Sequence, residues 1–518
     1  MSVENRTDVL FLQPPSPPFR DVLRDFAGGF GVALPSPRAE FGHGEVTQPY
    51  MSTVYAAASA ANAGMTVTYL DAQAENLDLK SLWQRVKNIQ PSVVVSVLSL
   101  PSLRADLQIL ENIKRLVECS IVGVGTVCRT AETLPEIVGS DGIDYAVNGD
   151  PEVVILPTLE RLLAGRSADD LPGLAYASSD GAVHRNEGGR LIDLDTLPVP
   201  HHSMLPMDHY RSWEFGRAVR LGSREFGHFP KVFPLYLSRG CPYGCDYCPY
   251  PLGFGNRWRR KSVEHVMEEL HAITRAGVNH FYLRDQTVGE DLDFLAEVCE
   301  AIVQDKSGVQ WLCETRPGSL DASMLRLMRR AGCLRIHYGV ETGDTRTFVS
   351  QAKRGVDPSA IAPCLEQTRA ADILPSLHFL IGFPNDDWES VAATLDLIRT
   401  CGVSAGDCAL MTPYPGTRQY QTVLREGRLL ARSWDDFTGS DPIVHIDGLS
   451  PVELVLARWR VLTAVTDMNQ PRLRRRLAKA VLAGQETSVE VAALIDSSIR
   501  AASAISTPGG SDSAIRGA

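Results

Sequence analysis

Short apolar runs, many of them rich in β-branched residues, alternate with helical segments along most of the chain, and this alternation constrains the fold more than any other feature. In the first third, the runs predict strands at residues 8–13, 66–70, 93–97, 121–124 and 144–147. Helical segments separate the strands at βαβ spacing. We therefore expect residues 1–160 to form one doubly wound parallel sheet.

The alternation stops and then restarts. Residues 161–230 carry no sustained periodicity and are rich in Pro, His and Arg, so we expect a linker or cap there. Between residues 231 and 425, strands and helices alternate again, which predicts a partial (β/α)6 barrel. Its strands are expected at residues 233–237, 280–283, 310–313, 334–338, 377–381 and 408–411. Residues 426–506 are expected to form a helical C-terminal region, and residues 507–518, rich in Gly and Ser, a flexible tail.

Charge and hydropathy exclude several kinds of partner. The 51 basic and 62 acidic residues give a net charge of −11, which offers no general attraction for nucleic acid, so none is expected as a partner. No apolar run approaches the roughly 18 residues that span a bilayer, so no membrane partner is expected. Residues 1–6 are polar and include an acid, unlike a secretory signal. We therefore expect a cytoplasmic protein.

The chain has 11 cysteines, and three of them are clustered. The other eight stand alone and are expected to pack as small apolar residues; they are Cys119, Cys128, Cys299, Cys313, Cys333, Cys364, Cys401 and Cys408. Cys241, Cys245 and Cys248 follow the first predicted barrel strand with the spacing C-x3-C-x2-C. Active-site loops of such barrels lie after the strands, so this cluster is a candidate metal site.

Three thiolates in one tight loop can hold three irons of a four-iron cluster and leave the fourth iron open to a small molecule. Zinc usually takes two separated Cys or Cys/His pairs, and no second pair stands nearby in the sequence. A disulfide with a free thiol is disfavoured in a reducing compartment. The spacing thus favours an iron–sulfur cluster, with zinc or a structural role as the alternatives.

C-x3-C-x2-C after the first strand of an α/β barrel resembles the radical S-adenosylmethionine (SAM) superfamily. The resemblance implies that the open iron of a [4Fe-4S] cluster binds the amino and carboxylate groups of SAM. It also implies SAM contacts just past the later strands, and the matching residues are Asp285, Glu314, Arg316, Gly339, Glu341, Thr342, Gly382 and Pro415.

Three segments carry most of this resemblance. Residues 338–343, Tyr-Gly-Val-Glu-Thr-Gly, are similar to the family's Gly-x-Glu-Ser/Thr-Gly, whose acid suits ribose hydroxyls. Residues 380–384 are similar to its Ile-x-Gly-x-Pro segment beside the adenine, and residues 413–417 match a loop that many members share. Taken singly, the glycines of these segments could be turn residues; their shared placement after strands makes the resemblance specific.

The N-terminal sheet resembles the Rossmann-like cobalamin-binding domain of B12-dependent radical SAM enzymes. Strand-end loops of an open sheet form a ligand crevice, and the resemblance implies cobalamin contacts from Pro14, Pro15, Ser96, Ser99, Gly123, Gly125, Asn148, Gly149 and Glu152. The Asp-x-His-x-x-Gly motif that supplies a histidine to cobalt is absent. The alternatives are a scaffold without ligand or a different nucleotide; NAD is disfavoured because Gly123-x-Gly125 lacks a third glycine.

Together these resemblances imply a class B, cobalamin-dependent radical SAM methyltransferase. Such an enzyme transfers a methyl group from SAM, via methylcobalamin, to a carbon or phosphorus centre of a small molecule or natural-product intermediate. A reducing partner such as flavodoxin or ferredoxin is implied as well. One alternative is a B12-containing enzyme of cyclisation, ring contraction or oxidation, and another is an interaction protein with a structural cluster. The sequence assigns no catalytic side chain.

Overall fold

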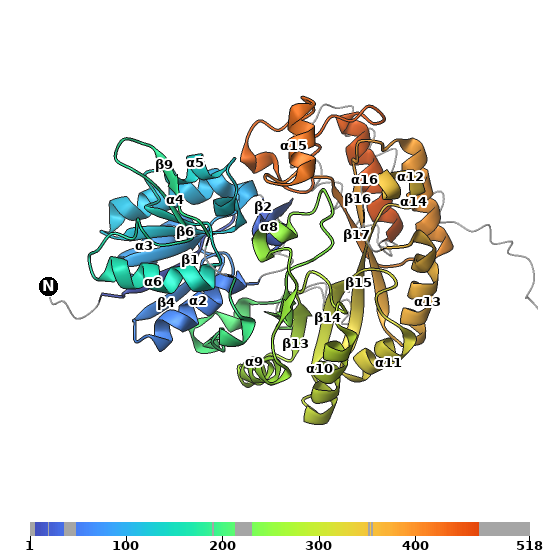
Figure 1. Cartoon of the computed structure of the whole chain (residues 1–518), viewed down its shortest axis with the longest axis horizontal. Helices are drawn as coiled ribbons and strands as arrows, with labels where there is room; N and C mark the ends of the chain where they lie inside the picture. Colours follow the sequence, from blue (N-terminus) through green and yellow to red (C-terminus); the bar gives the residue numbers. More distant parts are fainter. Residues whose placement is uncertain are drawn as a thin grey trace, which may run out of the picture.

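The structure, a computed structural model, describes residues 6–18, 20–35, 48–188, 191–212, 230–350, 353 and 356–465. It consists of two α/β halves, each built on one large sheet. Figure 1 shows the N-terminal half on the left and the barrel half on the right.

The N-terminal sheet has seven strands in the order β4-β1-β5-β6-β7-β8-β9. The first five strands of this order are parallel, and β8 and β9 are antiparallel additions. The strands are β1 (Val9–Gln13), β4 (Val67–Asp71), β5 (Val93–Val97), β6 (Ser120–Val124), β7 (Tyr145–Val147), β8 (Leu174–Ala177) and β9 (Val183–Arg185). The five predicted strands and their parallel pairing are confirmed.

Helices cover both faces of this sheet (Figure 1), as in a doubly wound fold. They are α2 (Met51–Asn62), α3 (Leu79–Ile89), α4 (Leu103–Leu116), α5 (Leu134–Val138) and α6 (Pro151–Leu163). The predicted boundary at residue 160 falls inside α6. The segment expected to be an irregular linker contributes β8 and β9 to the same sheet. The sequence did not predict these two strands, because their short, mixed sequences show no strand periodicity. Residues 213–229 of this segment lie outside the described residues.

The chain reverses its direction of winding at β1. From β1 the chain first passes to β4 on one side and then returns to β5 on the other. In open parallel sheets, the carboxyl ends of two such neighbouring strands flank the ligand crevice. A short hairpin of β2 (Arg20–Leu23) and β3 (Val32–Pro35) follows β1 and enters this region.

The barrel half holds six parallel strands in sequence order, which confirms the predicted partial barrel. They are β10 (Phe233–Leu235), β13 (His280–Leu283), β14 (Gln310–Thr315), β15 (Cys333–Glu341), β16 (Leu374–Ile381) and β17 (Gly406–Leu410). The helices outside the sheet are α9 (Val263–Arg275), α10 (Leu292–Asp305), α11 (Ala322–Arg330), α12 (Thr345–Ser350), α13 (Ile361–Ala370) and α14 (Trp388–Thr400).

The C-terminal part is less helical than expected. After α15 (Arg418–Arg425), the stretch 426–450 contains only a 3-10 turn at Trp434–Asp436 before α16 (Pro451–Val465). The expectation of helix was wrong here because backbone groups of this stretch pair across the isolated antiparallel bridge between Leu429 and Val444. The rest of the predicted helical region and the predicted tail, residues 466–518, lie outside the described residues.

Within the described part of the chain, no helix combines the length and apolar character needed to cross a bilayer.

The two halves of the protein contact each other closely through backbone atoms. Helix α8 (Tyr250–Phe254), which follows the cysteine loop, packs on the 3-10 turns η2 (Ala27–Gly29) and η4 (Thr126–Arg129) of the N-terminal half. A Cβ added at Gly253 would lie 2.0 Å from the Gly28 carbonyl oxygen, so no side chain fits there. The carboxyl edges of the two sheets are thereby brought against each other.

We expect Gly253→Ala to separate or strain this contact. The added methyl group overlaps backbone rather than a movable side chain, and overpacking of this kind costs about 1–3 kcal/mol of the free energy of unfolding or more. Chemical denaturation measures the loss. Gly188→Ala is the control, because its Cβ would meet nothing nearer than 3.9 Å; an equal effect of the two changes would contradict the proposed tightness of the contact.

Candidate functional site

The three clustered cysteines lie in a loop at the carboxyl end of the first barrel strand. The loop leaves through β11 (Ser238–Arg239) and returns through β12 (Arg259–Arg260), and these two short strands pair with each other. Cys241 N donates to the Gly255 carbonyl over 3.2 Å, and Cys248 N donates to the Cys245 carbonyl over 3.1 Å. These bonds fold the thiols into one compact turn, as the sequence predicts.

The thiols are free, half-buried and influence one another. Burial, together with smaller effects of the neighbouring Cys245 and Cys241, raises the pKa of Cys248 to about 12. Burial and Cys245 also raise the pKa of Cys241. A thiolate pair or trio here therefore needs a bound cation to be stable at neutral pH. Of the eight other cysteines, seven are buried and Cys119 is half-buried, which confirms their expected packing.

The thiol arrangement suits a cluster better than a single ion. Among the described residues, no three His, Cys, Asp or Glu side chains are gathered as ligands of one metal ion. The cysteines of a four-iron cluster each bind a different iron, so they stand farther apart than ligands of one zinc ion. The residues present fit a [4Fe-4S] cluster.

Arg316, predicted to contact SAM, lies against the cysteine loop. Its guanidinium stands 3.1 Å from the centre of the Tyr243 ring and 3.7 Å from the Glu290 carboxylate. The Tyr243 hydroxyl donates to Glu290 Oε2 over 3.0 Å. Arg316 and Glu290 thus clamp the loop between its first two cysteines. Glu290 was missed by the sequence analysis, since it stands in an irregular segment without a motif.

Asp285 braces the root of the same loop. Its Oδ1 accepts the Leu237 backbone N–H over 2.8 Å, and its Oδ2 accepts the Ser238 hydroxyl. The side chain is 2% exposed, and burial raises the pKa of Asp285 to about 6 although Ser238 lowers it. Both oxygens are thus bonded within the protein, and a contact with the SAM ammonium group stays a prediction.

The fourth barrel strand brings Gly339, Glu341 and Thr342 to the same mouth. Glu341 has a φ of 69°, which is strained for a residue with a side chain, and its carboxylate binds Lys353 Nζ. A Cβ on Gly339 would lie 3.1 Å from Lys353 Nζ, so a larger residue would disturb that ion pair. Thr342 is buried and its hydroxyl accepts the Asp344 N–H. Strain at such a position is typical of functional sites.

The last two strands end in the predicted loops. Gly382 has a φ of 105°, and its N–H and that of Phe383 donate to Asp386 Oδ2 over 2.8 and 3.0 Å. Pro415 is buried in the loop after β17. All the SAM candidates therefore lie at or near the carboxyl ends of the parallel barrel strands, and their contacts with SAM stay predictions.

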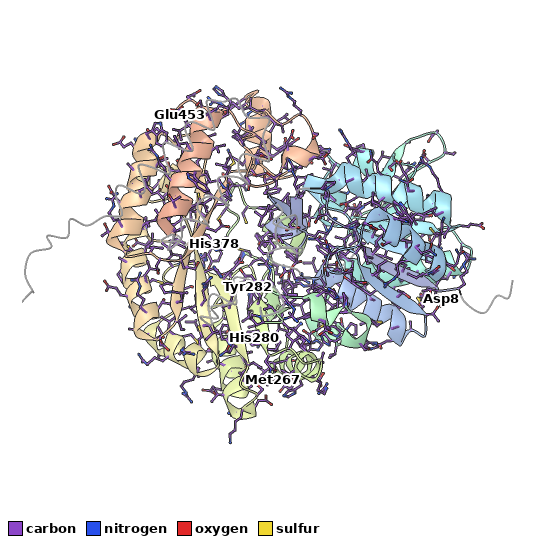
Figure 2. All side chains as sticks on the ribbon, turned by 180° about the vertical axis from the view of Figure 1, so that it is seen from behind. Asp8, Met267, His280, Tyr282, His378 and Glu453 are labelled. Carbon is purple, nitrogen blue, oxygen red and sulfur yellow. The ribbon has the colours of Figure 1, made fainter. Side chains whose placement is uncertain are left out.

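A polar cluster lines the inner side of the barrel sheet; the sequence analysis singled out its Glu314 as a SAM contact, which stays a prediction, and missed the other members. Glu314 Oε1 accepts the Tyr282 hydroxyl over 2.7 Å and Arg284 Nη1 over 2.9 Å. Strand register sets His337 beside Glu314, and His337 Nδ1 lies 2.9 Å from His378 Nε2. Figure 2 shows Tyr282 and His378 toward the middle of the molecule. The alternating polar residues Arg335 and His337 of β15, and Ser376 and His378 of β16, were the available signal.

The surroundings of Glu314 and His337 determine their protonation states. Burial alone would raise the pKa of Glu314, but Arg284, His378 and the Tyr282 hydrogen bond hold it below its ordinary value, so Glu314 is ionised. Burial, His378 and Arg335 hold the pKa of His337 well below its ordinary value, so this imidazole is neutral. Buried titratable groups are costly and are often retained for function.

The cobalamin candidates meet at the carboxyl edge of the N-terminal sheet. Ser96 and Ser99 are fully buried at the end of β5, and Gly123 and Gly125 follow on β6. Gly125 has a φ of 151°, and a Cβ there would lie 2.4 Å from the Leu98 carbonyl oxygen. Only glycine allows this approach of two strand ends.

The remaining candidates border the same edge. Pro14 and Pro15 directly follow β1, and the Pro14 carbonyl accepts Arg24 Nη2 over 3.2 Å. Asn148 and Gly149 bind the Gly173 carbonyl through their backbone N–H groups, over 2.8 and 3.1 Å. Glu152 lies in the first turn of α6 and forms an ion pair with Arg239 of the barrel half.

Two unpaired polar atoms indicate that this edge takes a ligand. Ser96 Oγ and Asn148 Oδ1 are buried and have no hydrogen-bond partner among the described residues. Buried polar groups without a partner are uncommon in proteins and call for an explanation such as an absent ligand. The residues present therefore fit a large ligand with hydrogen-bonding groups, such as a corrinoid.

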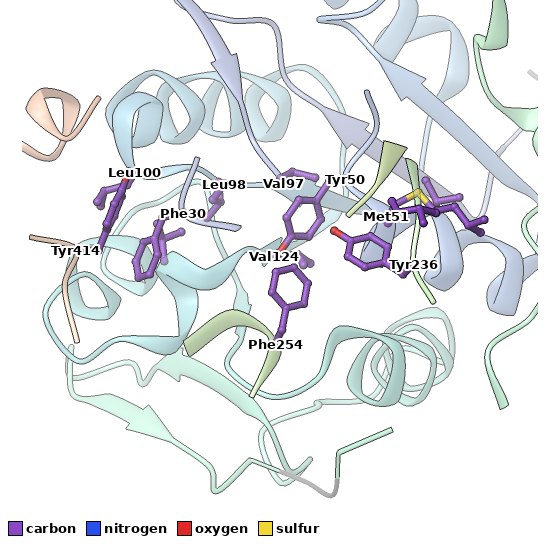
Figure 3. Close-up of a cluster of buried hydrophobic side chains, with 14 of the residues drawn as sticks. Phe30, Tyr50, Met51, Val97, Leu98, Leu100, Val124, Tyr236, Phe254 and Tyr414 are labelled. Atoms are coloured by element: carbon purple, nitrogen blue, oxygen red, sulfur yellow. The ribbon is translucent and has the colours of Figure 1, made fainter. Parts of the chain in front are cut away.

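Aromatic side chains from both halves cover these strand ends. Figure 3 shows Phe30 and Tyr50 of the N-terminal half beside Val97, Leu98 and Val124 at the ends of β5 and β6. Tyr236, Phe254 and Tyr414 reach the same cluster from the barrel half. This apolar cover suits the flat face of a macrocycle and excludes water from it.

The comparisons with known proteins agree with this geometry. The radical SAM superfamily matches residues 235–398, so the barrel half contains a radical SAM domain. An uncharacterised methyltransferase of Pyrococcus horikoshii is 26% identical over 385 residues, which cover 73% of this chain and 80% of that protein. An anaerobic magnesium-protoporphyrin IX monomethyl ester cyclase of Rubrivivax gelatinosus is 22% identical over 407 residues, covering 75% and 68%.

Among solved structures, the radical SAM methyltransferase TsrM of Kitasatospora setae, with cobalamin and a [4Fe-4S] cluster bound, has a TM-score of 0.64. The match covers 96% of this chain and 99% of that chain at 14% identity. The fold of the present chain, a Rossmann-like half followed by a radical SAM barrel, is therefore the fold of TsrM.

The buried Asp285 predicts a pH effect on the cofactor-free protein. Its pKa is about 6 when folded and about 4 when unfolded, so its contribution to stability is fully present below pH 4 and is lost as the pH rises through 6. We expect Asp285→Asn to gain about 3 kcal/mol relative to wild type between pH 3 and pH 7. Denaturant titrations at several pH values measure this.

Asp170→Asn serves as the control, because Asp170 is exposed and its hydrogen bond with Arg161 lowers its pKa, so this change gains no stability relative to wild type as the pH rises. A difference between Asp285→Asn and wild type that stays constant over this pH range would refute the assignment.

Proposed function

We propose that this chain is a cobalamin-dependent radical SAM methyltransferase that acts on a small molecule. The observation that carries the proposal is the meeting of two features. One is a loop with three free thiols at the mouth of a radical SAM barrel, and the other is the carboxyl edge of the adjoining Rossmann-like sheet, which carries buried polar atoms without hydrogen-bond partners among the described residues. Helix α8, which joins the cysteine loop to η2 and η4, holds the two features together.

The residues that would hold each group are separate. Cys241, Cys245 and Cys248 would hold the cluster, the ends of β15 and β16 would hold SAM, and the ends of β5 and β6 would hold the corrinoid. When bound, the cluster supplies single electrons to SAM, and the corrinoid supplies a cobalt centre that can carry a methyl group.

The chain's own residues position these groups and keep water out. Arg316 and Glu290 fix the cysteine loop through Tyr243. Tyr247 packs edge-on against Phe383 with ring centres 5.4 Å apart, which closes the barrel mouth beside the loop. A dry, rigid site protects reactive species and strengthens every electrostatic contact inside it.

The substrate is proposed to face the polar cluster of the barrel interior. Glu314 is ionised and accepts hydrogen bonds from Tyr282 and Arg284 through its Oε1, and His378 is half-buried on the same inner side. A carboxylate and an imidazole together suit a small molecule with N–H or O–H groups. We further propose that the methylated atom is a carbon or a phosphorus. A flavodoxin or ferredoxin is the proposed electron donor.

A second candidate is cyclisation or oxidation in place of methylation, which the likeness to an anaerobic magnesium-protoporphyrin IX monomethyl ester cyclase favours. Both reactions would use the same three groups. Product mass separates them: methylation adds a CH2 to the substrate, and cyclisation or oxidation adds none.

Anaerobic reconstitution tests the proposal. Protein loaded with iron, sulfide and hydroxocobalamin is expected to show cluster and corrinoid absorption and, once reduced, to consume SAM. Cys245→Ala is expected to lose at least most of its iron and all SAM consumption, because three thiolates are needed to hold the cluster. Iron analysis and chromatography of SAM products measure both.

Cys364→Ala is the matched control, since Cys364 is buried in the barrel half away from the loop. The proposal fails if Cys245→Ala keeps its full iron content, or if the wild-type protein binds no corrinoid.

A further inference from the structure

The root of the cysteine loop is tied to the N-terminal half by a buried ion pair. Arg239 stands two residues before Cys241, and its Nη1 lies 2.8 Å from Glu152 Oε1 at the start of α6. The side chains are 3% and 0% exposed, respectively. The Arg239 guanidinium also lies 5.5 Å from the centres of the Tyr55 and Tyr236 rings, one from each half.

The two charged groups of this ion pair are close, but several of their polar atoms have no hydrogen-bond partner among the described residues. Neither Glu152 oxygen, nor Arg239 Nε or Nη2, has a hydrogen-bond partner among the described residues. Buried charges normally need several hydrogen bonds to offset the loss of water. Glu152 also belongs to the strand-end crevice, where Ser96 Oγ and Asn148 Oδ1 are unpaired as well. The pair is therefore free to rearrange when hydrogen-bonding groups enter the crevice.

The rest of the loop is held from the same side. Arg129 of η4 donates to the Gly253 carbonyl over 2.7 Å, just after the last cysteine. Lys261, at the far end of the loop, donates to Tyr55 of α2 over 3.0 Å and pairs with Glu269 over 2.6 Å. The N-terminal half thus contacts the cysteine loop near its start, its middle and its end. Of these contacts, the one through Glu152 also belongs to the crevice.

We propose that Glu152 and Arg239 are positioning residues that couple occupancy of the N-terminal crevice to the geometry of the cysteine loop. This inference rests on the proposed function. Hydrogen bonds from a bound ligand to Glu152 would compete with its ion pair to Arg239, and a shift of Arg239 would move the backbone that carries Cys241. In the opposite direction, a cluster that orders the loop fixes Arg239 and presents Glu152 to the corrinoid.

Such coupling is reciprocal and measurable. If the cluster changes the corrinoid affinity by some factor, the corrinoid must change the cluster affinity by the same factor, and coupling between two sites is typically about 5–150-fold. We therefore expect the affinity for hydroxocobalamin to differ at least about fivefold between cluster-loaded and cluster-free protein.

The test uses full-length protein and hydroxocobalamin as the probe. Absorbance titrations give its dissociation constant with the cluster loaded and after removal of iron by a chelator. The variant is the double change Glu152→Gln with Arg239→Gln, which removes both charges and leaves no lone buried ion that would prevent folding. The control is Asp144→Asn, which breaks the Lys114–Asp144 ion pair of 2.7 Å at the amino end of β7.

In wild type and Asp144→Asn, the two dissociation constants should differ at least fivefold; in the double variant they should differ less than twofold, while iron and corrinoid still bind. The electron paramagnetic resonance signal of the reduced cluster should shift on corrinoid addition in wild type and stay unchanged in the double variant. A double variant that keeps the fivefold difference, or a wild type without one, overturns the proposal.

Failure of the proposed function has a different signature. Wild-type protein that binds no hydroxocobalamin or no iron defeats the proposed function, and amide hydrogen exchange of residues 240–248 in the cofactor-free protein then decides the positioning role. Exchange about tenfold faster in the double variant than in Asp144→Asn supports the role of the pair in holding the loop. Equal exchange in the two proteins overturns it.

Discussion

The carboxyl edges of two parallel sheets are pressed together through backbone at Gly28 and Gly253, where a single Cβ would overlap a carbonyl oxygen. Parallel strands collect their loops at one edge, so each sheet offers only one place for a ligand. Because these two places face each other, a group held at the ends of β5 and β6 lies next to whatever the cysteine loop holds. The remaining features of the site depend on this juxtaposition.

Buried charge is concentrated along that contact. Arg239 with Glu152, Lys261 with Glu269, and Arg284 with Glu314 all lie within or beside it. Each pair costs desolvation free energy that apolar residues would avoid, so stability alone does not explain them. Their common position, around the loop that carries the thiols, indicates that they determine where that loop lies.

Much of the architecture was predictable from the sequence. Strands such as β5 and β14 are apolar runs bounded by helices, and their type and order follow from periodicity. The cysteine spacing predicted a candidate metal site, since the chemistry of three neighbouring thiols is local. By contrast, β8 and β9 were missed because pairing with β7 supplies the stability that their own sequences lack.

The site was predictable only where a motif is contiguous. Arg316 and Asp285 were predicted to contact SAM, and these contacts stay predictions; that Arg316 lies against Tyr243 and that Asp285 accepts from Leu237 and Ser238 was not foreseen. Both roles arise from contacts between strands that the sequence alone does not bring together. The same holds for His337 and His378, which stand 41 residues apart and meet only through the register of β15 and β16.

The high pKa of the Cys248 thiol, about 12, has a consequence for the newly made protein. At neutral pH this thiol is almost entirely protonated, and protonated thiols react slowly with peroxides and disulfides. We therefore expect the Cys248 thiol of the cluster-free protein to resist oxidation. Filling the cysteine loop must release protons to solvent, so cluster assembly is easier in alkaline than in acidic surroundings.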